Sequence, residues 1–441
     1  MTPIAWPARV ATVAGGAALA LLLSACGTEA DAEASATPTA APATTQEEQV
    51  VEDDYEGESD AVEQAGATPR LAVTYDGGIA VIDARSLEVV GTLDLDGFNR
   101  IAPAGDERHV VVSTAGGWSV LDTGTWTDAH GEHGHSFTSE PVLHDVIVEA
   151  EAPGHVVVHD GLTTLFDDGT GQVTVIETGE WTEMVEHGDV HAVREYSAAS
   201  AHHGVAATAT DGTMLVTEGG EDDVNAAMIL NADDEVIASS DQCPGLHGET
   251  AFTSASGEAY MMTGCEDGVL AFHGGDVHKI AAPDDFGRIG NAYSVDGSDV
   301  VLGDYKTDPE GGIGLTQATL IDVADESITV IDPFEGADAE YTWRGLARGT
   351  AGEALALGTD GALRVIDPAT GDVVRSIDVI DEWEVPEDWQ SPHPALIVIQ
   401  GMAFVTEPAS GAIHAVDYMG GAVWNSGVVD LEMTEIVGVN G

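Results

Sequence analysis

The sequence predicts an all-β fold, a β-propeller of eight blades with seven as the alternative count, and three observations predict it. First, β-branched runs broken by Gly and Asp dominate the chain, whereas helix signals are scarce. Second, one phrase recurs at roughly 40 to 55 residues, which is the spacing of propeller blades. Third, about 370 residues follow the N-terminal region, which is long for one core but ordinary for a fold that grows by repeats.

Each copy of the phrase is two short strands joined by a Gly-containing turn, and a third strand follows. The first copy, residues 71–83, reads LAVTYDGGIAVID, and its third strand is expected at 89–93. Clear copies also lie at 110–122, at 354–367 and at 397–417, and others begin near residues 155, 204, 249 and 300. Because a blade cannot bury both faces alone, the copies are expected to close around a central channel as one domain, 69–441.

The phrase is similar to those of WD40-like and YVTN-type propellers, which by itself implies a binding platform and no particular reaction. Acids that end a strand, such as Asp83, Asp122 and Asp367, are interpreted as turn-capping residues and not as ligands.

Residues 1–25 are predicted to be a lipoprotein signal peptide. Arg9 precedes an apolar run from Val10 to Leu23, and the run ends in Leu-Ser-Ala followed by Cys26, the pattern of a bacterial lipobox. Acylation of Cys26 would place the protein outside the cytoplasm, lipid-anchored to the outer face of the cell membrane. A simple secretory signal with a chance cysteine is the alternative.

Residues 26–68 are predicted to form a disordered acidic linker after the lipidated cysteine. Positions 27–68 hold twelve acidic residues and no Lys or Arg, so the segment cannot bury enough apolar surface to offset its chain entropy. The net charge of −65 for the whole chain excludes non-specific binding to nucleic acid. General adaptation to salt or alkaline surroundings explains this charge best, and a field that attracts cations is a compatible second interpretation.

Two cysteines remain once Cys26 is set aside. Cys243 and Cys265 are 22 residues apart, and in an oxidising compartment this favours a disulfide. Ligation of zinc by the two thiolates is the alternative.

Histidines supply the candidate metal ligands, most of them between His130 and His278. The tract AHGEHGHSF holds three in a Gly-rich segment suited to folding around a cation: His130, His133 and His135. Three more stand at the start of a blade's first strand: His155, His203 and His247. First strands line the channel and run in one direction, so these side chains are expected to converge at one mouth. His159 and His202 are further candidates, and Glu249 is a second-shell or ligand candidate. The alternative for each histidine is an ordinary hydrogen-bonded side chain, and a shift of one residue in register would turn it away.

The motifs AHGEHGHSF, PGHVVVHDG, HHGVAAT, CPGLHGE, GCEDGV, RIGN and VLGDYK occur in this order, and the set resembles the AztD family of extracytoplasmic zinc metallochaperones. The resemblance covers about residue 70 to about residue 416. It implies a β-propeller that carries zinc on histidines of these motifs and passes it to the solute-binding protein of a zinc ABC transporter. It also implies that the tract aids capture or delivery and that the cysteine pair is a structural disulfide. The lipobox distinguishes this chain from a soluble periplasmic protein of that family, and it indicates a protein anchored at the surface of a Gram-positive cell.

These observations favour a zinc-binding chaperone over two other classes of protein. A metal-independent surface propeller for protein interaction is the main alternative. An enzyme is not expected, because the chain has no G-x-S-x-G nucleophile elbow and no H-E-x-x-H helix. The fixed tight site is assigned to His155, His203 and His247, and the tract is expected to be a mobile loop that catches zinc or hands it over.

Overall fold

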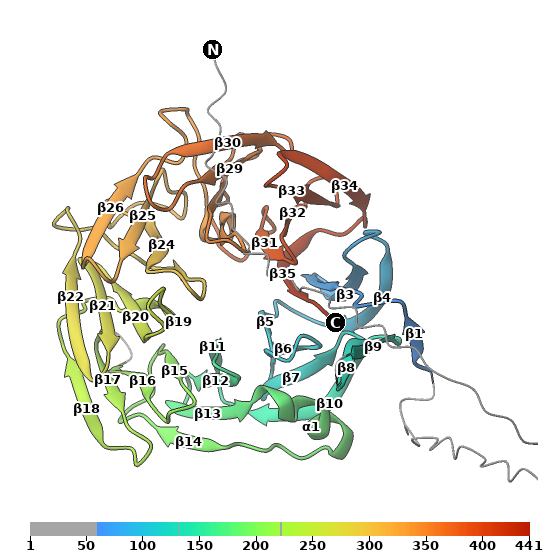
Figure 1. The fold of residues 1–441 in the computed structure, drawn as a ribbon, viewed down its shortest axis with the longest axis horizontal. Helices are drawn as coiled ribbons and strands as arrows, with labels where there is room; N and C mark the ends of the chain where they lie inside the picture. The colour runs from blue at the N-terminus through green and yellow to red at the C-terminus, as the bar shows by residue number, and fades with distance from the viewer. Residues whose placement is uncertain (1–59, 132, 221–222) are drawn as a thin grey trace, which may run out of the picture. The chain divides into compact units, whose positions relative to one another are not determined.

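The computed structural model describes residues 60–131, 133–220 and 223–441, and eight four-stranded sheets in this part stand as blades around a ring (Figure 1). The predicted eight-bladed β-propeller is therefore confirmed. The predicted signal peptide, Cys26 and the linker up to residue 59 lie outside the described residues. Within the described ranges, no helix has the length and apolar character needed to cross a bilayer.

The blades are numbered 1 to 8 in chain order. Blade 1 contains β35 (Met433–Val439), β2 (Arg70–Tyr75), β3 (Gly77–Asp83) and β4 (Val89–Leu95). Blade 2 contains β5 (Ile101–Pro103), β6 (His109–Thr114), β7 (Gly117–Asp122) and β10 (Val142–Glu149), and blade 3 contains β11 (Pro153–His159), β12 (Leu162–Asp167), β13 (Gln172–Glu177) and β14 (Arg194–Ser197). Blade 4 contains β15 (Ala206–Thr208), β16 (Met214–Gly220), β17 (Asp223–Leu230) and β18 (Val236–Ser240).

Blade 5 contains β19 (His247–Thr253), β20 (Ala259–Cys265), β21 (Gly268–His273) and β22 (Asp276–Ala281). Blade 6 contains β23 (Ala292–Tyr293), β24 (Val300–Tyr305), β25 (Gln317–Asp322) and β26 (Ser327–Ile331), and blade 7 contains β27 (Leu346–Arg348), β28 (Ala354–Leu357), β29 (Ala362–Ile366) and β30 (Val373–Asp378). Blade 8 contains β31 (Leu396–Ile399), β32 (Met402–Glu407), β33 (Ala412–Asp417) and β34 (Ala422–Val428). The helical segments are η1 (Thr178–Glu180), α1 (Trp181–His187) and η2 (Trp343–Gly345).

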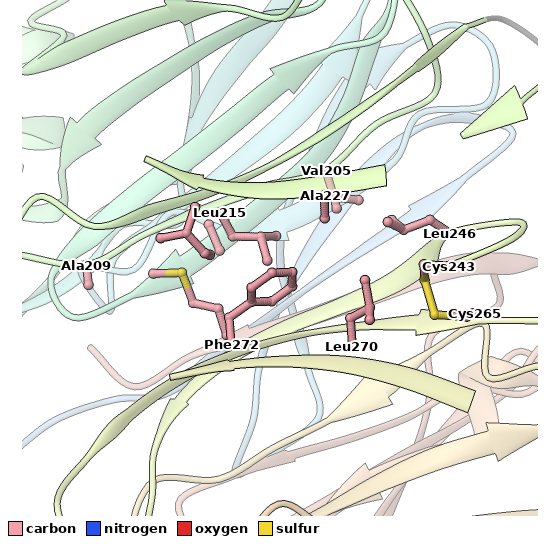
Figure 2. Close-up of a cluster of buried hydrophobic side chains, with 12 residues drawn as sticks. Val205, Ala209, Leu215, Ala227, Cys243, Leu246, Cys265, Leu270 and Phe272 are labelled. Atoms are coloured by element: carbon pink, nitrogen blue, oxygen red, sulfur yellow. A yellow bond between two sulfur atoms is a disulfide. The ribbon is translucent and has the colours of Figure 1, made fainter. Parts of the chain in front are cut away.

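Burial along the strands explains the repeating phrase. The middle strands β2 and β3 are buried on both faces, so their sequences read as continuous apolar runs. The outer strand β34 alternates exposed and half-buried residues, as expected where one face meets solvent. Each of the eight apolar clusters lies between two neighbouring blades, and together they occupy every junction of the ring. Figure 2 shows the cluster between blades 4 and 5.

The last strand closes the ring. β35 pairs antiparallel with β2, with Val73 opposite Ile436, so blade 1 combines the C-terminal strand with the first three strands of the phrase. This pairing ties the two ends of the propeller together.

Two predictions about local order are wrong. Val62–Gln64, placed in the disordered linker, forms β1, which pairs with β9 (His133–Thr138). The histidine tract, predicted as a mobile loop, instead forms the hairpin of β8 (Thr125–His130) and β9. The Trp126 and Phe137 rings of this hairpin stack at 5.6 Å, and the Arg108 guanidinium lies 4.2 Å from the Trp126 ring. These contacts order a segment whose composition alone would leave it mobile.

The strand-end acids act at turns as predicted. Asp83 Oδ1 accepts the backbone N–H of Ser86 at 2.7 Å, and Asp367 Oδ1 accepts that of Ala369 at 2.9 Å. Asp122 also accepts the N–H of Gly124 at 2.7 Å, but it is buried in an ion pair with Arg108 as well.

Candidate metal centre

Three histidines from consecutive blades converge at the innermost strands of the ring. His155 lies in β11, His247 begins β19, and His203 lies just before β15. One ligand atom from each lies within 4.8 Å of the others, and this is the one such group of His, Cys, Asp or Glu found among the residues that the structure describes. We call it the three-histidine site. Its ring centroids are 4.9, 5.0 and 5.3 Å apart.

The spacing of two of the three nitrogens suits a small tetrahedral cation. The Nε2 atoms of His155 and His203 are 3.4 Å apart. A tetrahedral zinc ion bound at 2.0–2.1 Å to two imidazoles would separate their nitrogens by about 3.4 Å. Two neutral imidazole nitrogens gain little from facing each other at this distance, whereas an ion between them uses both lone pairs.

Each imidazole is held at its other nitrogen by an acceptor. His155 Nδ1 lies 2.7 Å from Glu249 Oε1, and His203 Nδ1 lies 2.6 Å from Asp168 Oδ2. His247 Nδ1 lies 2.5 Å from the carbonyl oxygen of Gly290. An ionised carboxylate and a carbonyl can only accept, so the Nδ1–H donates in each pair and a neutral ring keeps its lone pair on Nε2. This is the outer support typical of histidines that bind metals.

The surroundings change the pKa values of two of the histidines in opposite directions. Burial alone would lower the pKa of His155, but the charge and hydrogen bond of Glu249 outweigh burial and raise it above its ordinary value. Burial, together with repulsion from His155, lowers the pKa of His247 to about 4. His247 is therefore neutral and ready to ligate at physiological pH, whereas a proton competes with a metal for His155.

Local backbone geometry places His247. Gly248 has a φ of +74°, and a Cβ there would lie 2.7 Å from the carbonyl carbon of Gly290. Glycine thus lets the Gly290 backbone approach the His247 ring. Asp304 Oδ1 fixes the far side of this loop by accepting the N–H groups of Gly290 at 2.6 Å and Asn291 at 3.0 Å.

The predicted disulfide is confirmed and lies close to the site in sequence. Cys243 and Cys265 are bonded, and both are fully buried. Figure 2 shows the bond beside Leu246 and Leu270 in the apolar cluster between blades 4 and 5. The alternative of two thiolates ligating zinc is excluded for this oxidised pair.

Access to the site differs among its members. The His203 side chain is 55% exposed, whereas that of His155 is 18% exposed and that of Glu249 is 10% exposed. The site therefore opens to solvent on the His203 side, and a bound cation would be reached there first.

The other predicted histidines lie elsewhere. His202 is buried, and both of its ring nitrogens have partners within the protein: Nδ1 lies 2.8 Å from the Ser200 carbonyl oxygen and Nε2 lies 2.9 Å from Thr217 Oγ1. His159 ends β11, roughly 13 Å along the strand from His155, and is not in the three-histidine group.

His133 and His135 of the tract also lie outside the three-histidine group. His133 and His135 lie on β9 with their rings 5.2 Å apart, and His135 Nδ1 lies 2.8 Å from Glu63 Oε1. His130 ends β8.

Two supports of the site were missed by sequence reasoning. Asp168 follows Asp167, and Asp167 alone serves the turn by accepting the N–H of Gly169 and the hydroxyl of Thr170. The turn uses only the first acid of this Asp-Asp-Gly sequence, so the presence of a second acid, Asp168, could have indicated a residue with a separate role. The Gly290 carbonyl carries no side-chain signal at all.

Comparisons with known proteins agree with the fold. No family model matches the chain. The zinc chaperone AztD of Citrobacter koseri is 24% identical over 361 residues, which cover 77% of this chain and 78% of that protein. The chain is similar to AztD. The crystal structure of C. koseri AztD superimposes with a TM-score of 0.71 at 20% identity, and covers 85% of this chain and 99% of its own.

The structure of apo AztD from the same organism gives a TM-score of 0.69 at 19% identity, covering 85% of this chain and 98% of its own. The resemblance to AztD-type chaperones is therefore confirmed over the propeller. At these identities, the likeness to the solved structures shows the fold alone.

Proposed function

We propose that this protein binds zinc at the three-histidine site and delivers it to the solute-binding protein of a zinc ABC importer. The observation that carries the proposal is the convergence of His155, His203 and His247, each held at Nδ1 by an acceptor. The similarity to a zinc chaperone supports the choice of cargo. The predicted lipobox at Cys26 would place this activity on the outer face of the cell membrane.

Zinc is the cargo that the ligand set fits best among borderline metals. Neutral imidazoles suit zinc, copper and nickel, but reduced copper favours thiolate and thioether ligands. The two cysteines nearest the site are joined in a disulfide, and Met262 is fully buried in the apolar cluster between blades 5 and 6. Zinc is also the ion for which three histidines and an open fourth position are common.

The geometry also suits a protein that must release its cargo. Three protein ligands leave a position for an incoming group, and the exposed His203 side chain can be exchanged before the more buried ligands. A closed site with four buried ligands would lack this route. We do not expect an enzyme, because the site has its metal ligands and their acceptors but no built nucleophile.

The test is zinc binding by chelator-stripped protein, measured by competition titration at neutral pH. We expect tight binding by the wild type and a loss of at least tenfold in affinity for His155→Ala, His203→Ala and His247→Ala. The matched control is His273→Ala, since His273 is a half-buried histidine on β21 outside the site. Stripped wild-type protein that takes up no zinc would refute the proposal and favour the metal-independent interaction propeller.

Delivery is tested separately. Loaded protein is mixed with the stripped solute-binding protein in the presence of a chelator that captures free zinc. Direct transfer predicts that the acceptor gains zinc at a rate the chelator does not reduce. Transfer that falls to the rate of spontaneous release would limit the function to zinc storage.

A further inference from the structure

A small cavity adjoins the three-histidine site on the side of blade 6. Its volume is about 170 Å³, and its walls include His247, Arg288, Gly290, Asp304, Lys306 and Trp343. Sites for drug-sized ligands measure roughly 300–1,000 Å³, so this space suits a small molecule or a single side chain. We call it the Arg288–Lys306 pocket.

The two cations of this pocket are weakly compensated in a very acidic protein. The chain has 78 Asp and Glu against 13 Lys and Arg. Lys306 Nζ nevertheless donates to the carbonyl of Gly311 at 2.7 Å, and within the described ranges it forms no ion pair. Arg288 donates to the carbonyl of Gly245 at 2.9 Å, and its ion-pair partner Glu266 is 4.0 Å away.

The acid in the pocket wall, Asp304, already accepts hydrogen bonds from the protein. Asp304 Oδ1 accepts two backbone N–H groups, from Gly290 and Asn291, and Oδ2 accepts the Asn291 side chain at 2.7 Å. These bonds hold the loop that supports His247, and the Asp304 carboxylate also attracts Arg288, so the pocket wall has two cations and one carboxylate. The pocket therefore presents net positive charge beside a metal ligand.

A zinc ion bound at the three-histidine site would require a further ligand, and an anion could be that ligand. Three neutral imidazoles bring no charge to the ion and leave its fourth position open, and the carboxylates of Glu249 and Asp168 act on it only through the imidazole rings. Among the described residues, no carboxylate oxygen joins the three-histidine group. The pocket shares His247 with the site, so an anion that extends from the pocket to that position would interact both with the metal and with the Arg288 guanidinium. A guanidinium binds carboxylates strongly through bidentate hydrogen bonds.

We propose that the Arg288–Lys306 pocket binds a carboxylate that occupies the fourth coordination position of the zinc at the three-histidine site. The carboxylate is either a free small carboxylate or an Asp or Glu side chain of the acceptor protein, and its chemistry is the same in both cases. This inference rests on the proposed zinc binding.

Cobalt(II) in place of zinc provides the measurement, because its visible spectrum reports changes among its ligands. Stripped protein is loaded with cobalt and titrated with acetate at constant pH and ionic strength, with perchlorate as the control salt. We expect acetate, but not perchlorate, to change the spectrum and to tighten zinc binding at least threefold. In Arg288→Gln/Lys306→Gln, both responses should vanish while metal binding without acetate persists.

Two further variants make the result specific. Lys306→Gln alone guards against misfolding, since Lys306 contributes one hydrogen bond to a carbonyl; it should weaken the acetate response at least twofold. Arg85→Gln/Arg375→Gln removes two exposed arginines of blades 1 and 7 and should respond to acetate as the wild type does.

The transfer assay distinguishes the two sources. If the acceptor's side chain enters the pocket, the double variant transfers zinc at least threefold more slowly and acetate inhibits transfer by the wild type. If a free carboxylate is the ligand, the variant loses its acetate response but transfers at the wild-type rate. The proposal is overturned if acetate changes neither spectrum nor affinity and the variant transfers normally, or if the acetate response survives in the double variant. A wild type that binds no metal would refute the proposed function itself.

Discussion

The disulfide offers the sharpest test of how the fold positions the metal ligands. The change is Cys243→Ala together with Cys265→Ala, since reduced thiols would themselves be zinc ligands. The bond closes a loop across a sequence separation of 22 residues. The loss of loop closure predicts a decrease of about 3 kcal/mol in the free energy of unfolding.

The same substitution should weaken zinc binding through His247. Cys243 lies four residues before His247, and the register of β19 and β20 places His247 opposite Gly264, next to Cys265. The Cys265 carbonyl accepts the N–H of Ile289 at 3.0 Å, just before the Gly290 carbonyl that holds the His247 ring. We expect a tenfold loss of zinc affinity, about 1.4 kcal/mol, because both the ligand and its acceptor gain freedom.

Denaturant unfolding and zinc competition titrations measure the two effects. Leu363→Ala is the matched control, since Leu363 is fully buried between blades 7 and 8, away from the site, and the substitution costs about 2–5 kcal/mol. In a His247→Ala background, disulfide removal should cause no further loss of affinity. Disulfide-free protein that binds zinc as tightly as the Leu363→Ala control would show that the disulfide does not position the metal ligands.

The remaining predictions concern the supports and the pH dependence of the site. Glu249→Gln should weaken zinc binding by about 10–100-fold in competition titrations, because it removes the charged acceptor of His155; unchanged affinity would contradict that role. Because the pKa of His155 is raised, zinc affinity should fall as the pH decreases from 8 through this pKa, whereas His247 gains a proton only near pH 4. Titrations between pH 8 and 5 that show constant affinity would exclude this competition. Replacing the tract histidines by Ala (His130, His133 and His135) should leave equilibrium affinity unchanged and slow loading in stopped-flow measurements; a large loss of affinity would make them ligands.

Repetition made the fold readable from the sequence. The phrase beginning at Leu71 can be recognised because the middle strands β2 and β3 are buried on both faces and are therefore apolar, and the same pattern recurs in β12, β24 and β28. Eight clusters of such residues fill the eight junctions, so the pattern that identifies a strand also builds the ring. The way the ring closes was not predictable, because nothing in β35 alone selects β2 as its partner.

The candidate site was predictable only in part, because strand register decides which side chain faces the channel. His202 and His203 are adjacent, yet one is buried against Thr217 and the other reaches Asp168 at the open site. The sequence offered both as ligands, since neighbouring residues in extended chain point in opposite directions and a shift of one residue exchanges them. The partners Asp168 and Gly290 come from other segments, and only the closed ring brings them together.

The arrangement of supports suggests why such a site can hold a cation firmly and still give it up. Firm binding needs imidazoles fixed in one tautomer, and the acceptors at Nδ1 provide this for all three rings. Release needs ligands that can be replaced one at a time, and under the proposed function the exposed His203 would leave first while Glu249 and the Gly290 carbonyl still hold His155 and His247. An anion in the Arg288–Lys306 pocket would compensate charge as imidazoles leave the ion. Binding and release would therefore depend on different faces of the same site, and under the proposed function this would let an acceptor take the zinc without unfolding the propeller.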